Sequence, residues 1–582
     1  MRGYVRRTVG FVIAGLVALH TLQACSESDG GGSPTSDAGA AGAAGEAYGE
    51  AGEASSSSGT GGGAGGAGSS QGGQDSGEGG GSSQGGVPGA DAGSGGDGGG
   101  GTVQRCLEGD DGTLGCVSSR LLVGTAVNVE VLDQQEYADV LTSEFGYVTP
   151  ENVMKWGPLQ PAPDSWDFTP ADELLSFAEQ HGQVVKGHAL VWHVQQPDWT
   201  SSLDAPALVS AVEAHIKETV PHFAGRVRAW DVVNEAILDG GLGIRPGLHT
   251  ALGISGMANA FKWAREADPT AKLYYNDYGI EFFNDKSDAV HRLIQDLLAE
   301  GAPIDGIGFQ AHVSTKHYPS LEGLRANIAR FANLGLTVNI SELDVRTAEV
   351  PGTKAKRLAA QAITYREFAA ACALEDACEA VTLWGFTDAY SWVDEEFGAD
   401  DPLPWDEAYQ KKPAHAALLL GLAGKRSPAG AELLLDGGCE TGAGWSGFGG
   451  ATIGVVANGR TGNACRATSR TEEYHGPAVS LTGKVPKGAT ISVRAYARIA
   501  SAEGGRIKLF LKKVEAGVAD EYFELAGRAV PDAGWTLLTA NFTLGFATAP
   551  SELTLWVESP PIDGQLPNLL VDDMTVEILS AD

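Results

Sequence analysis

Basic residues are scarce in this chain. Of its 582 residues, 40 are Lys or Arg and 74 are Asp or Glu, which gives a formal charge of −34, and no basic residue lies between Cys25 and Arg105. Proteins that bind nucleic acid present basic surfaces, so we expect no nucleic-acid partner. The acidic balance fits an exported protein that acts on a neutral substrate, but charge alone names no substrate.

The first apolar run is too short to cross a membrane. Val9–Leu19 falls below the roughly 20 residues that a spanning helix needs, and three arginines precede it, so residues 1–25 are predicted to be a signal peptide. Its end, Leu22-Gln23-Ala24-Cys25, resembles the lipobox of bacterial lipoproteins, in which the cysteine is acylated. The resemblance implies a lipid anchor at Cys25 and a place at the outer membrane or outer surface. Ordinary cleavage nearby, followed by secretion, stays open.

Large side chains are rare in residues 26–104. Most of the segment is Gly, Ser and Ala, and the 81 glycines of the chain are concentrated before residue 102. Such a segment cannot bury enough apolar surface to offset its ordering entropy, so we expect a disordered, flexible linker. A glycine-rich nucleotide-binding loop is excluded, because no strand precedes these glycines and no helix follows them.

Cysteine is also infrequent, and no CxxC pair occurs among the 7 cysteines, so we expect no structural zinc. With Cys25 set aside, six cysteines remain, and six allow many connectivities. Pairing in an exported protein is expected. Proximity in the sequence suggests the pairs Cys106–Cys116, Cys372–Cys378 and Cys439–Cys465.

Apolar strand-like runs alternate with helical patterns between residues 117 and about 425. Such repetition indicates parallel strands with right-handed crossovers, and eight repeats predict a closed (β/α)8 TIM barrel in a domain spanning 105–425. An open doubly wound sheet is the alternative, but the nucleotide fingerprint expected after its first strand is absent. The expected strands are Leu121–Val127, Tyr147–Thr149, Val184–Val191, Val227–Trp230, Leu273–Asn276, Gly306–Gln310, Val338–Ser341 and Ala380–Thr387, and the expected helices include Pro206–Phe223, Asp285–Glu300, Leu321–Asn333 and Thr353–Ala371.

Polar side chains stand at the carboxyl ends of these strands, the face on which barrels carry their active sites. Glu235 follows the fourth expected strand and Glu342 the seventh. Glycoside hydrolysis needs two such carboxylic acids, one to donate a proton and one to attack the sugar. A zinc site formed by His188, His193 and His312 is the alternative. The HxxxxH spacing of the first two matches no common zinc pattern, so we expect no metal.

Seven stretches of this region stand in a recognisable order. They are TPENVMKW (149–156), KGHALVWH (186–193), WDVVNEA (230–236), YYNDYGIE (274–281), IDGIGFQAH (304–312), ISELDV (340–345) and LWGFTDAYSW (383–392). Together they resemble glycoside hydrolase family 10, the endo-β-1,4-xylanases, over nearly all of residues 117–425. The Cys372–Cys378 spacing is also similar to that of the family. Lys186, where the family commonly has Arg, is a departure that bears on fine specificity.

The resemblance implies a retaining reaction without a cofactor. Glu342 would be the nucleophile and Glu235 the acid/base, with their carboxyl groups roughly 5 Å apart. His312 and Asp344 match the pair that supports the nucleophile, and Asn234 matches the residue that bonds the 2-hydroxyl of the sugar. By the same match, three groups of residues would bind the sugars. The subsite at the cleaved bond would be lined by His188, Trp192, Gln310, Trp384 and Trp392. The next sugar on the non-reducing side would be bound by Glu151, Asn152 and Lys155, and the leaving group would be contacted by Tyr278 and Asn276.

After a short polar break at 425–429, short alternating strands replace the helical pattern. They predict a β-sandwich over residues 431–582. The expected strands are Thr490–Arg498, Arg506–Lys512, Thr536–Leu544, Glu552–Glu558 and Leu569–Ile578. The stretches LDGGCETGAGW (435–445) and VDDMTV (571–576) resemble carbohydrate-binding modules of families 4, 9 and 22. Candidate sugar contacts, each with a structural role equally open, are Arg470, Tyr474, Tyr522 and Glu558. Calcium held by Glu440 and Asp572 stays open, because spacing alone does not show it.

These observations predict an exported, monomeric endo-β-1,4-xylanase whose partner is xylan or a related plant cell-wall β-1,4-polysaccharide. Two alternatives remain. One is a β-1,4-glucanase with the same barrel, and the other is a surface protein that only binds polysaccharide.

Overall fold

The computed structural model describes residues 112–500, 504–530 and 533–581, so the predicted signal peptide, Cys25 and the linker lie outside the described residues. Within those ranges, no helix is both long enough and apolar enough to cross a membrane. Two large hydrophobic clusters, one before residue 425 and one after residue 430, form separate cores. The described chain therefore contains two domains.

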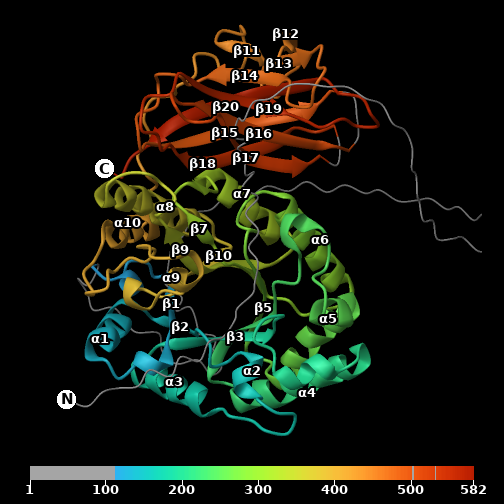
Figure 1. Cartoon of the computed structure of the whole chain (residues 1–582). Helices are drawn as coiled ribbons and strands as arrows, with labels where there is room; N and C mark the ends of the chain where they lie inside the picture. The colour runs from blue at the N-terminus through green and yellow to red at the C-terminus, as the bar shows by residue number, and fades with distance from the viewer. Residues whose placement is uncertain (1–111, 501–503, 531–532, 582) are drawn as a thin grey trace, which may run out of the picture. The chain divides into compact units, whose positions relative to one another are not determined.

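Eight parallel strands form the first domain. Their order is β10-β1-β2-β3-β4-β5-β6-β9, and β9 pairs with β10 to close the ring. The predicted closed barrel is confirmed, and the open sheet is excluded (Figure 1). The strands are β1 (Leu122–Val127), β2 (Tyr147–Pro150), β3 (Val184–Val191), β4 (Val227–Asn234), β5 (Lys272–Asp277), β6 (Gly306–Phe309), β9 (Thr337–Arg346) and β10 (Cys378–Leu383).

Helices surround this barrel (Figure 1). Side chains cap several of their first turns: Asp204, Asn284 and Ser320 each accept a hydrogen bond from a backbone N–H that has no partner inside its helix. The α-helices are α1 (Gln135–Glu144), α2 (Trp156–Leu159), α3 (Thr169–Gln180), α4 (Ala205–His222), α5 (Leu248–Ala267), α6 (Asp285–Ala299), α7 (Leu321–Ala332), α8 (Lys354–Leu374), α9 (Val393–Phe397) and α10 (Pro413–Leu422). Short 3-10 helices are η1 (Leu114–Cys116), η2 (Val129–Val131), η3 (Asp198–Ser202), η4 (Asp239–Gly241) and η5 (Asp388–Tyr390).

The strand β9 is longer than its sequence pattern predicts. The short strand β7 (His312–Ser314), which leads into β8 (His317–Tyr318), pairs with its second half and sets His312 opposite Asp344. Glu342 therefore lies inside β9, and the prediction that it stands at a strand end is wrong. The prediction for Glu235 is confirmed, because β4 ends at Asn234.

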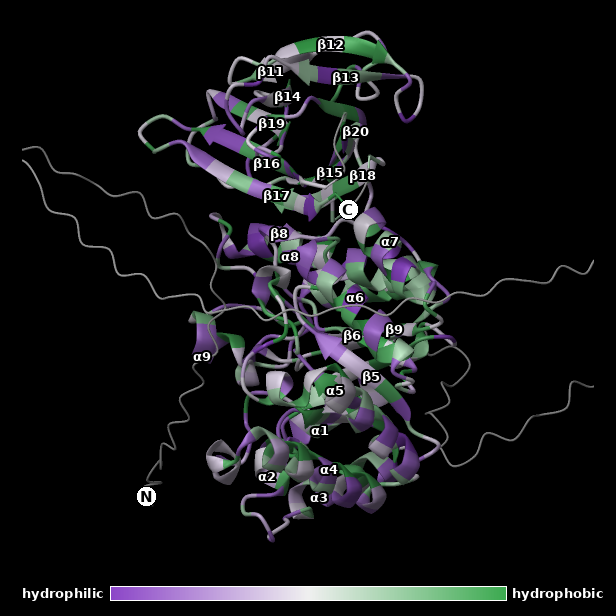
Figure 2. Cartoon of the chain, turned by 90° about the vertical axis from the view of Figure 1, so that its right-hand side faces the viewer, coloured by the Kyte–Doolittle hydropathy of each residue, from purple (hydrophilic) through white to green (hydrophobic). Residues whose placement is uncertain are grey.

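The second domain is a sandwich of two antiparallel sheets. One has the order β18-β15-β20-β13-β12 and the other β11-β14-β19-β16-β17. Buried and partly exposed residues alternate along β16. Figure 2 shows hydrophilic and hydrophobic residues following one another along the strands of this domain. The five predicted strands are present, and five more were missed. The strands are β11 (Trp445–Phe448), β12 (Thr452–Ala457), β13 (Asn463–Thr468), β14 (Gly476–Ser480), β15 (Thr490–Ile499), β16 (Arg506–Val514), β17 (Glu521–Ala529), β18 (Thr536–Thr543), β19 (Glu552–Glu558) and β20 (Leu569–Leu579).

Disulfides link Cys372 to Cys378 and Cys439 to Cys465, as the sequence suggested. The first joins the end of α8 to the start of β10 in the barrel, and the second joins the start of the sandwich to β13. The third suggested pair involves Cys106, which lies outside the described residues.

Candidate active site

Two buried carboxyl groups face a shared layer of amides at the end of the barrel. Asn276 on β5 donates through Nδ2 to Glu342 Oε1 at 2.6 Å and to Asn234 Oδ1 at 2.8 Å. Asn234 in turn donates to Glu235 Oε1 at 3.2 Å, and Gln310 donates to the same oxygen at 3.0 Å. The amides therefore connect the two acids that the sequence singled out.

The register of the strands builds this layer. Asn234 of β4 lies opposite Asn276 of β5, and Asn276 lies opposite Gly308 of β6. A Cβ at Gly308 would stand 2.0 Å from Asn276 Oδ1, so only glycine leaves room for the amide. Ser341 donates to the same oxygen at 2.6 Å. Both hydrogen-bonding ends of Asn276 are thus occupied by protein groups.

The contacts of Asn276 give it a different role from the predicted contact with the leaving group. Its side chain has no exposed surface and already donates to Asn234 and Glu342, so it orients these residues and is not free to contact a leaving group. Asn234 is equally buried but keeps one amide N–H without a partner among the described residues. Its predicted contact with a sugar hydroxyl remains open.

Glu342 is held as a carboxylate. Burial raises its pKa, but three neighbours outweigh this effect. They are the charge of His188, whose Nδ1 lies 4.0 Å from Glu342 Oε1, and the hydrogen bonds from His312 and Asn276. The pKa of Glu342 falls from 4.5 to about 2. A carboxylate that stays ionised at all working pH values is suited to attack an electrophilic carbon.

His312 bridges two acids. Its Nε2 lies 3.2 Å from Glu342 Oε2 and its Nδ1 lies 2.8 Å from Asp344 Oδ2, which also accepts from Trp392 Nε1 at 2.8 Å. Burial lowers the pKa of His312, but the charges and hydrogen bonds of the two carboxylates raise it from 6.5 to about 10. At neutral pH the ring is an imidazolium that donates to both acids. The predicted support of the nucleophile by His312 and Asp344 fits this geometry.

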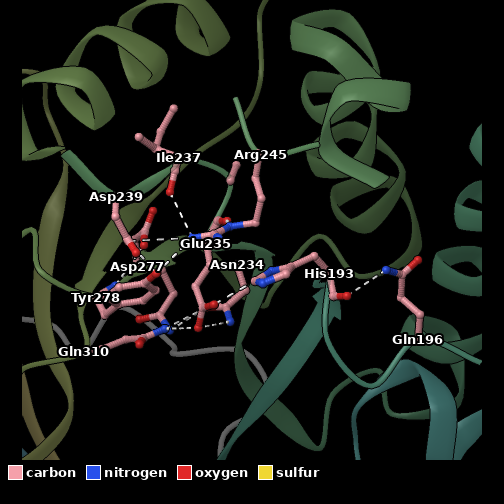
Figure 3. Close-up of polar contacts among 12 residues, drawn as sticks. His193, Gln196, Asn234, Glu235, Ile237, Asp239, Arg245, Asp277, Tyr278 and Gln310 are labelled. Carbon is pink, nitrogen blue, oxygen red and sulfur yellow. Dashed lines mark hydrogen bonds and ion pairs between the residues drawn. The ribbon is translucent and has the colours of Figure 1, made fainter. Parts of the chain in front are cut away.

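Glu235 has different surroundings (Figure 3). Its carboxyl group contacts the neutral amides of Asn234 and Gln310, and Oε2 lies 3.8 Å from Nδ1 of His193. Burial lowers the pKa of His193 to about 4, with further contributions from nearby cations, so this ring is neutral at working pH. The two acids thus differ, because Glu342 faces a cation where Glu235 faces neutral groups.

The backbone of Glu235 is fixed in the left-handed region, at a φ of 57°. A non-glycine residue adopts this conformation only where its surroundings enforce it. The Glu235 N–H donates to the Asn276 carbonyl at 2.9 Å, and its carbonyl accepts from Nε of Arg245 at 3.0 Å. Arg245 also donates to the Ile237 carbonyl at 3.2 Å and to the Tyr278 hydroxyl at 3.0 Å (Figure 3). Arg245 therefore clamps the loop that carries Glu235.

Sequence reasoning missed Arg245, because it stands in a glycine-rich loop without a pattern of its own. It did single out Tyr278, whose hydroxyl donates to Asp239 at 2.6 Å and accepts from Arg245 (Figure 3). Lys286 lies 2.9 Å from the buried Asp277 and 3.3 Å from the centroid of the Tyr278 ring. Tyr278 is thus held between charged neighbours and remains partly exposed.

Behind His188 lies a buried ion pair. Lys186 Nζ is 2.8 Å from Asp231 Oδ1, and His188 Nδ1 is 2.9 Å from Asp231 Oδ2. Lys186 is 2% exposed, so its charge is balanced by Asp231. The lysine that departs from the family pattern still supplies a cation behind the carboxylate that orients His188.

The remaining predicted barrel residues gather around this centre. Lys155 lies 4.7 Å from the centroid of the Trp192 ring and donates to Asn152 at 3.1 Å. Burial lowers the pKa of Lys155 to about 8, against the opposing charge of Glu151. Ring contacts join His188 to Trp384 at 5.2 Å and His312 to Trp392 at 5.0 Å. All predicted barrel residues thus lie in or beside one network.

The predicted residues of the sandwich divide into two groups. Tyr474 and Tyr522 are 44% and 54% exposed, and Glu558 accepts from Trp556 Nε1 at 2.8 Å. Glu558 and Arg470 are both buried, but Arg470 differs in that its guanidinium donates to the carbonyls of His475, Pro567, Glu473 and Ser559. Of the two roles left open for Arg470, these four bonds support the structural one, in which it holds loops together.

An aromatic stack lies on the sheet that carries Tyr522. Trp556 lies between Phe448 and Phe510, with ring centroids 4.2 and 5.2 Å apart and nearly parallel planes, and Tyr522 meets it edge-on at 6.2 Å. In the described ranges, no group of three or more His, Cys, Asp and Glu side chains is arranged to hold a metal ion. The calcium expectation for Glu440 and Asp572 stays a prediction.

Two family models match the chain. The one for glycosyl hydrolase family 10 matches residues 116–420, and one for a carbohydrate binding domain matches residues 431–564. The chain is similar to endo-1,4-beta-xylanase B of Thermotoga neapolitana, with 40% identity over 289 residues, 49% of this chain and 83% of that protein. It is also similar to the crystal structure of native xylanase 10B from Thermotoga maritima, with 40% identity, a TM-score of 0.51 and coverage of 53% of this chain and 98% of that one. A third match is xylanase 10B from Thermotoga petrophila RKU-1 in complex with xylobiose, with 39% identity, a TM-score of 0.51 and coverage of 53% and 97%.

Proposed function

Because the chain belongs to glycosyl hydrolase family 10, we propose that it hydrolyses β-1,4-xylosidic bonds inside xylan chains with retention of the anomeric configuration. The observation that carries this proposal is the unequal setting of the two acids. Glu342 contacts an imidazolium, and its pKa is lowered to about 2, whereas the carboxyl group of Glu235 contacts two neutral amides and the neutral ring of His193. Glycosidases need two carboxyl groups with divided tasks, and in a retaining one the ionised carboxylate is the nucleophile.

In the first step, a carboxylate oxygen of Glu342 forms a bond to the anomeric carbon. The bond from that carbon to the bridging oxygen breaks, and the oxygen takes the proton of Glu235 as the leaving sugar departs. In the second step, Glu235, now a carboxylate, accepts a proton from water. The water oxygen attacks the anomeric carbon, the bond to Glu342 breaks, and both acids return to their starting states.

The chain's other polar groups assist these steps. The hydrogen bonds from His312 and Asn276 stabilise the carboxylate of Glu342 as it leaves in the second step, and the amide layer fixes the positions of the two carboxyl groups. The free N–H of Asn234 would bond the 2-hydroxyl. Rings of Trp192, Trp384 and Trp392 would cover the sugar faces, while His188, Gln310, Glu151, Asn152 and Lys155 would bond its hydroxyls.

Xylan is proposed as the substrate because the similar proteins are named xylanases and one of them was solved with xylobiose. A β-1,4-glucan is the alternative. Assays on both polymers, with equal masses of soluble xylan and carboxymethylcellulose, separate them. Hydrolysis of the glucan without hydrolysis of xylan would overturn the substrate assignment.

The assigned roles are tested with Glu342→Ala, Glu235→Ala and a surface control, Glu173→Ala. Glu342→Ala should have no turnover on xylan or on 2,4-dinitrophenyl xylobioside. Glu235→Ala should lose xylan hydrolysis but still form the glycosyl-enzyme from the dinitrophenyl substrate, whose leaving group needs no proton. Azide should then restore turnover and give the β-azide. Equal losses of Glu235→Ala on both substrates would reject the acid role.

We also propose that the sandwich holds the enzyme on its polymer. Exposed Tyr474 and Tyr522 and the stacked rings around Trp556 supply the apolar faces that sugar rings pack on, beside the carboxyl group of Glu558. Replacing both tyrosines by Ala should weaken retention on insoluble xylan and leave activity on soluble fragments unchanged. Unchanged retention would reject this role.

Export with a lipid anchor at Cys25 remains a proposal that rests on the lipobox alone. Labelling of growing cells with a clickable palmitate should mark the wild-type protein and not Cys25→Ser. Equal absence of label from both would favour secretion without an anchor.

A further inference from the structure

The sandwich carries a second candidate surface on the sheet β18-β15-β20-β13-β12, away from the aromatic stack. Along β15, residues of the core alternate with Arg494, Tyr496 and Arg498, which are partly exposed on the other face of the sheet. This face therefore presents two guanidinium groups and a phenol from a single strand.

Strand register adds a third arginine. Arg498 pairs with Leu570 of β20, and Leu570 pairs with Arg466 of β13, so the three side chains share one face. Leu570 is only 4% exposed although it stands outside the hydrophobic core, so neighbouring side chains on this face shield it. Arg498 and Arg466 lie on either side of Leu570, on strands that are roughly two strand spacings, about 10 Å, apart.

Aromatic rings orient two of the cations. The guanidinium of Arg498 lies 5.0 Å from the centroid of the Trp535 ring. The guanidinium of Arg460, from the loop between β12 and β13, lies 3.7 Å from the centroid of the Tyr496 ring. Stacking leaves the planar edge of a guanidinium free to donate. The basic face is defined as Arg460, Arg466, Arg494, Tyr496, Arg498 and Trp535.

Most of the donors on this face have no partner. Arg460 is paired with Asp573 at 2.6 Å. Across the described parts of the chain, the guanidinium groups of Arg466, Arg494 and Arg498 form no hydrogen bond or ion pair, and Nε of the latter two is buried without an acceptor. A buried donor without an acceptor costs free energy, which an added anionic ligand would recover.

The acidic neighbours do not neutralise the face. Asp573 is occupied by Arg460. Asp572 is buried and accepts from the backbone N–H groups of Arg460 and Thr461. Glu577 lies opposite Ser492, one step along β15 from Arg494, and forms no ion pair with it in the described structure. An uncompensated basic face stands out in a chain with a formal charge of −34.

We propose that the basic face binds carboxylate groups carried as side substituents on a polysaccharide, so that the sandwich selects acidic xylan over neutral xylan. The inference rests on the proposed function. Arginine is the residue suited to a carboxylate, because its fork donates two parallel hydrogen bonds. The rings of Trp535 and Tyr496 beside the cations offer apolar surface to the sugar that bears the acid. Nucleic acid would be repelled by the charge of the whole chain.

The test measures binding of the full chain in a Glu342→Ala background, which prevents cleavage. Affinity electrophoresis compares a xylan bearing uronic acid groups with the same xylan after its carboxyl groups have been reduced to alcohols. The paired substitution Arg466→Gln with Arg498→Gln removes two charges from the face. The matched control, Lys484→Gln with Lys487→Gln, removes two charges from an exposed loop of the same domain.

The Glu342→Ala protein without further changes, called the parent, should bind the acidic polymer about tenfold more tightly than the reduced one. This is the gain expected from about one charged hydrogen bond. Added salt should make the difference in affinity smaller. The paired arginine variant should lose the preference and keep its binding to the reduced polymer, which shows that it is folded. The paired lysine variant should keep the preference.

Two results would overturn the inference: equal binding of both polymers by the Glu342→Ala protein, or a preference for the acidic polymer that survives in the arginine variant. A surviving preference together with lost adsorption to phosphatidylglycerol vesicles would assign the face to a membrane surface. A failure of the proposed function gives a different result, because the wild-type enzyme would then release no sugar from the reduced polymer.

Discussion

His312→Gln changes the charge beside the proposed nucleophile while keeping an amide donor in its place. Glu342 is buried, and its pKa of about 2 against an ordinary 4.5 depends on His188, His312 and Asn276 together. At about 1.36 kcal/mol for each pKa unit, the network favours the carboxylate by about 3 kcal/mol. A hydrogen bond from a charged donor supplies about 1.5–3 kcal/mol, so loss of the imidazolium should raise the pKa of Glu342 by about one to two units.

The sign follows from the role of the carboxylate. Protonated Glu342 cannot attack, so activity is lost as the pH falls through its pKa, and a raised pKa moves that loss to higher pH. The acid limb of kcat/KM for an aryl xylobioside should therefore shift upward by about one to two pH units in His312→Gln. His181→Gln, on the exposed end of α3, is the control and should leave the limb in place. An acid limb of His312→Gln that coincides with that of wild type would refute the argument.

Three further predictions follow from the same network. Arg245→Met removes the clamp on the Glu235 carbonyl and should lower kcat on xylan about tenfold or more while sparing the dinitrophenyl substrate; equal losses on both would show a general structural defect. The charge of His312 should add stability below pH 6.5 that is lost as the pH rises towards 10, so the Tm difference between wild type and His312→Gln should be larger at pH 6 than at pH 10. Gly308→Ala should displace Asn276 and abolish most activity, whereas Gly454→Ala, where a Cβ meets no atom within 4 Å, should have no effect; an active Gly308→Ala would contradict the packing argument.

The barrel could be predicted from local patterns because its strands are continuous apolar runs and its helices carry clear boundaries. The strand Val184–Val191 was placed at its true limits, since both of its faces are buried and its residues are apolar throughout most of its length. The extension of β9 to Arg346 could not be predicted. It depends on pairing with β7, 32 residues earlier in the chain, and no local signal reports a distant partner.

The candidate acids were identified because each stands inside a long matching segment. The layer of amides that connects the two acids could not be identified from the sequence, because Asn276 contributes through its cross-strand neighbours and not through its place in a motif. The roles of Arg245 and Arg470 could not be told apart from the sequence either. One clamps a backbone carbonyl beside the site, and the other bonds four carbonyls of the sandwich, yet both are single arginines in loops of the sequence.

The sandwich was only half predicted. Its long strands β15 and β16 alternate clearly, but β12 has an irregular, largely exposed pattern, and β11 and β14 are four and five residues long. Such short segments carry too little periodicity to separate a strand from a loop.

The most direct test of the central claim is NMR of the anomeric protons during the first minutes of xylan hydrolysis by the wild-type enzyme, before mutarotation mixes the products. The account predicts that the β-anomer of the new reducing end appears first, because two displacements at the anomeric carbon restore its configuration. Early appearance of the α-anomer would mean a single displacement by water, and the assignment of Glu342 as nucleophile would then be wrong.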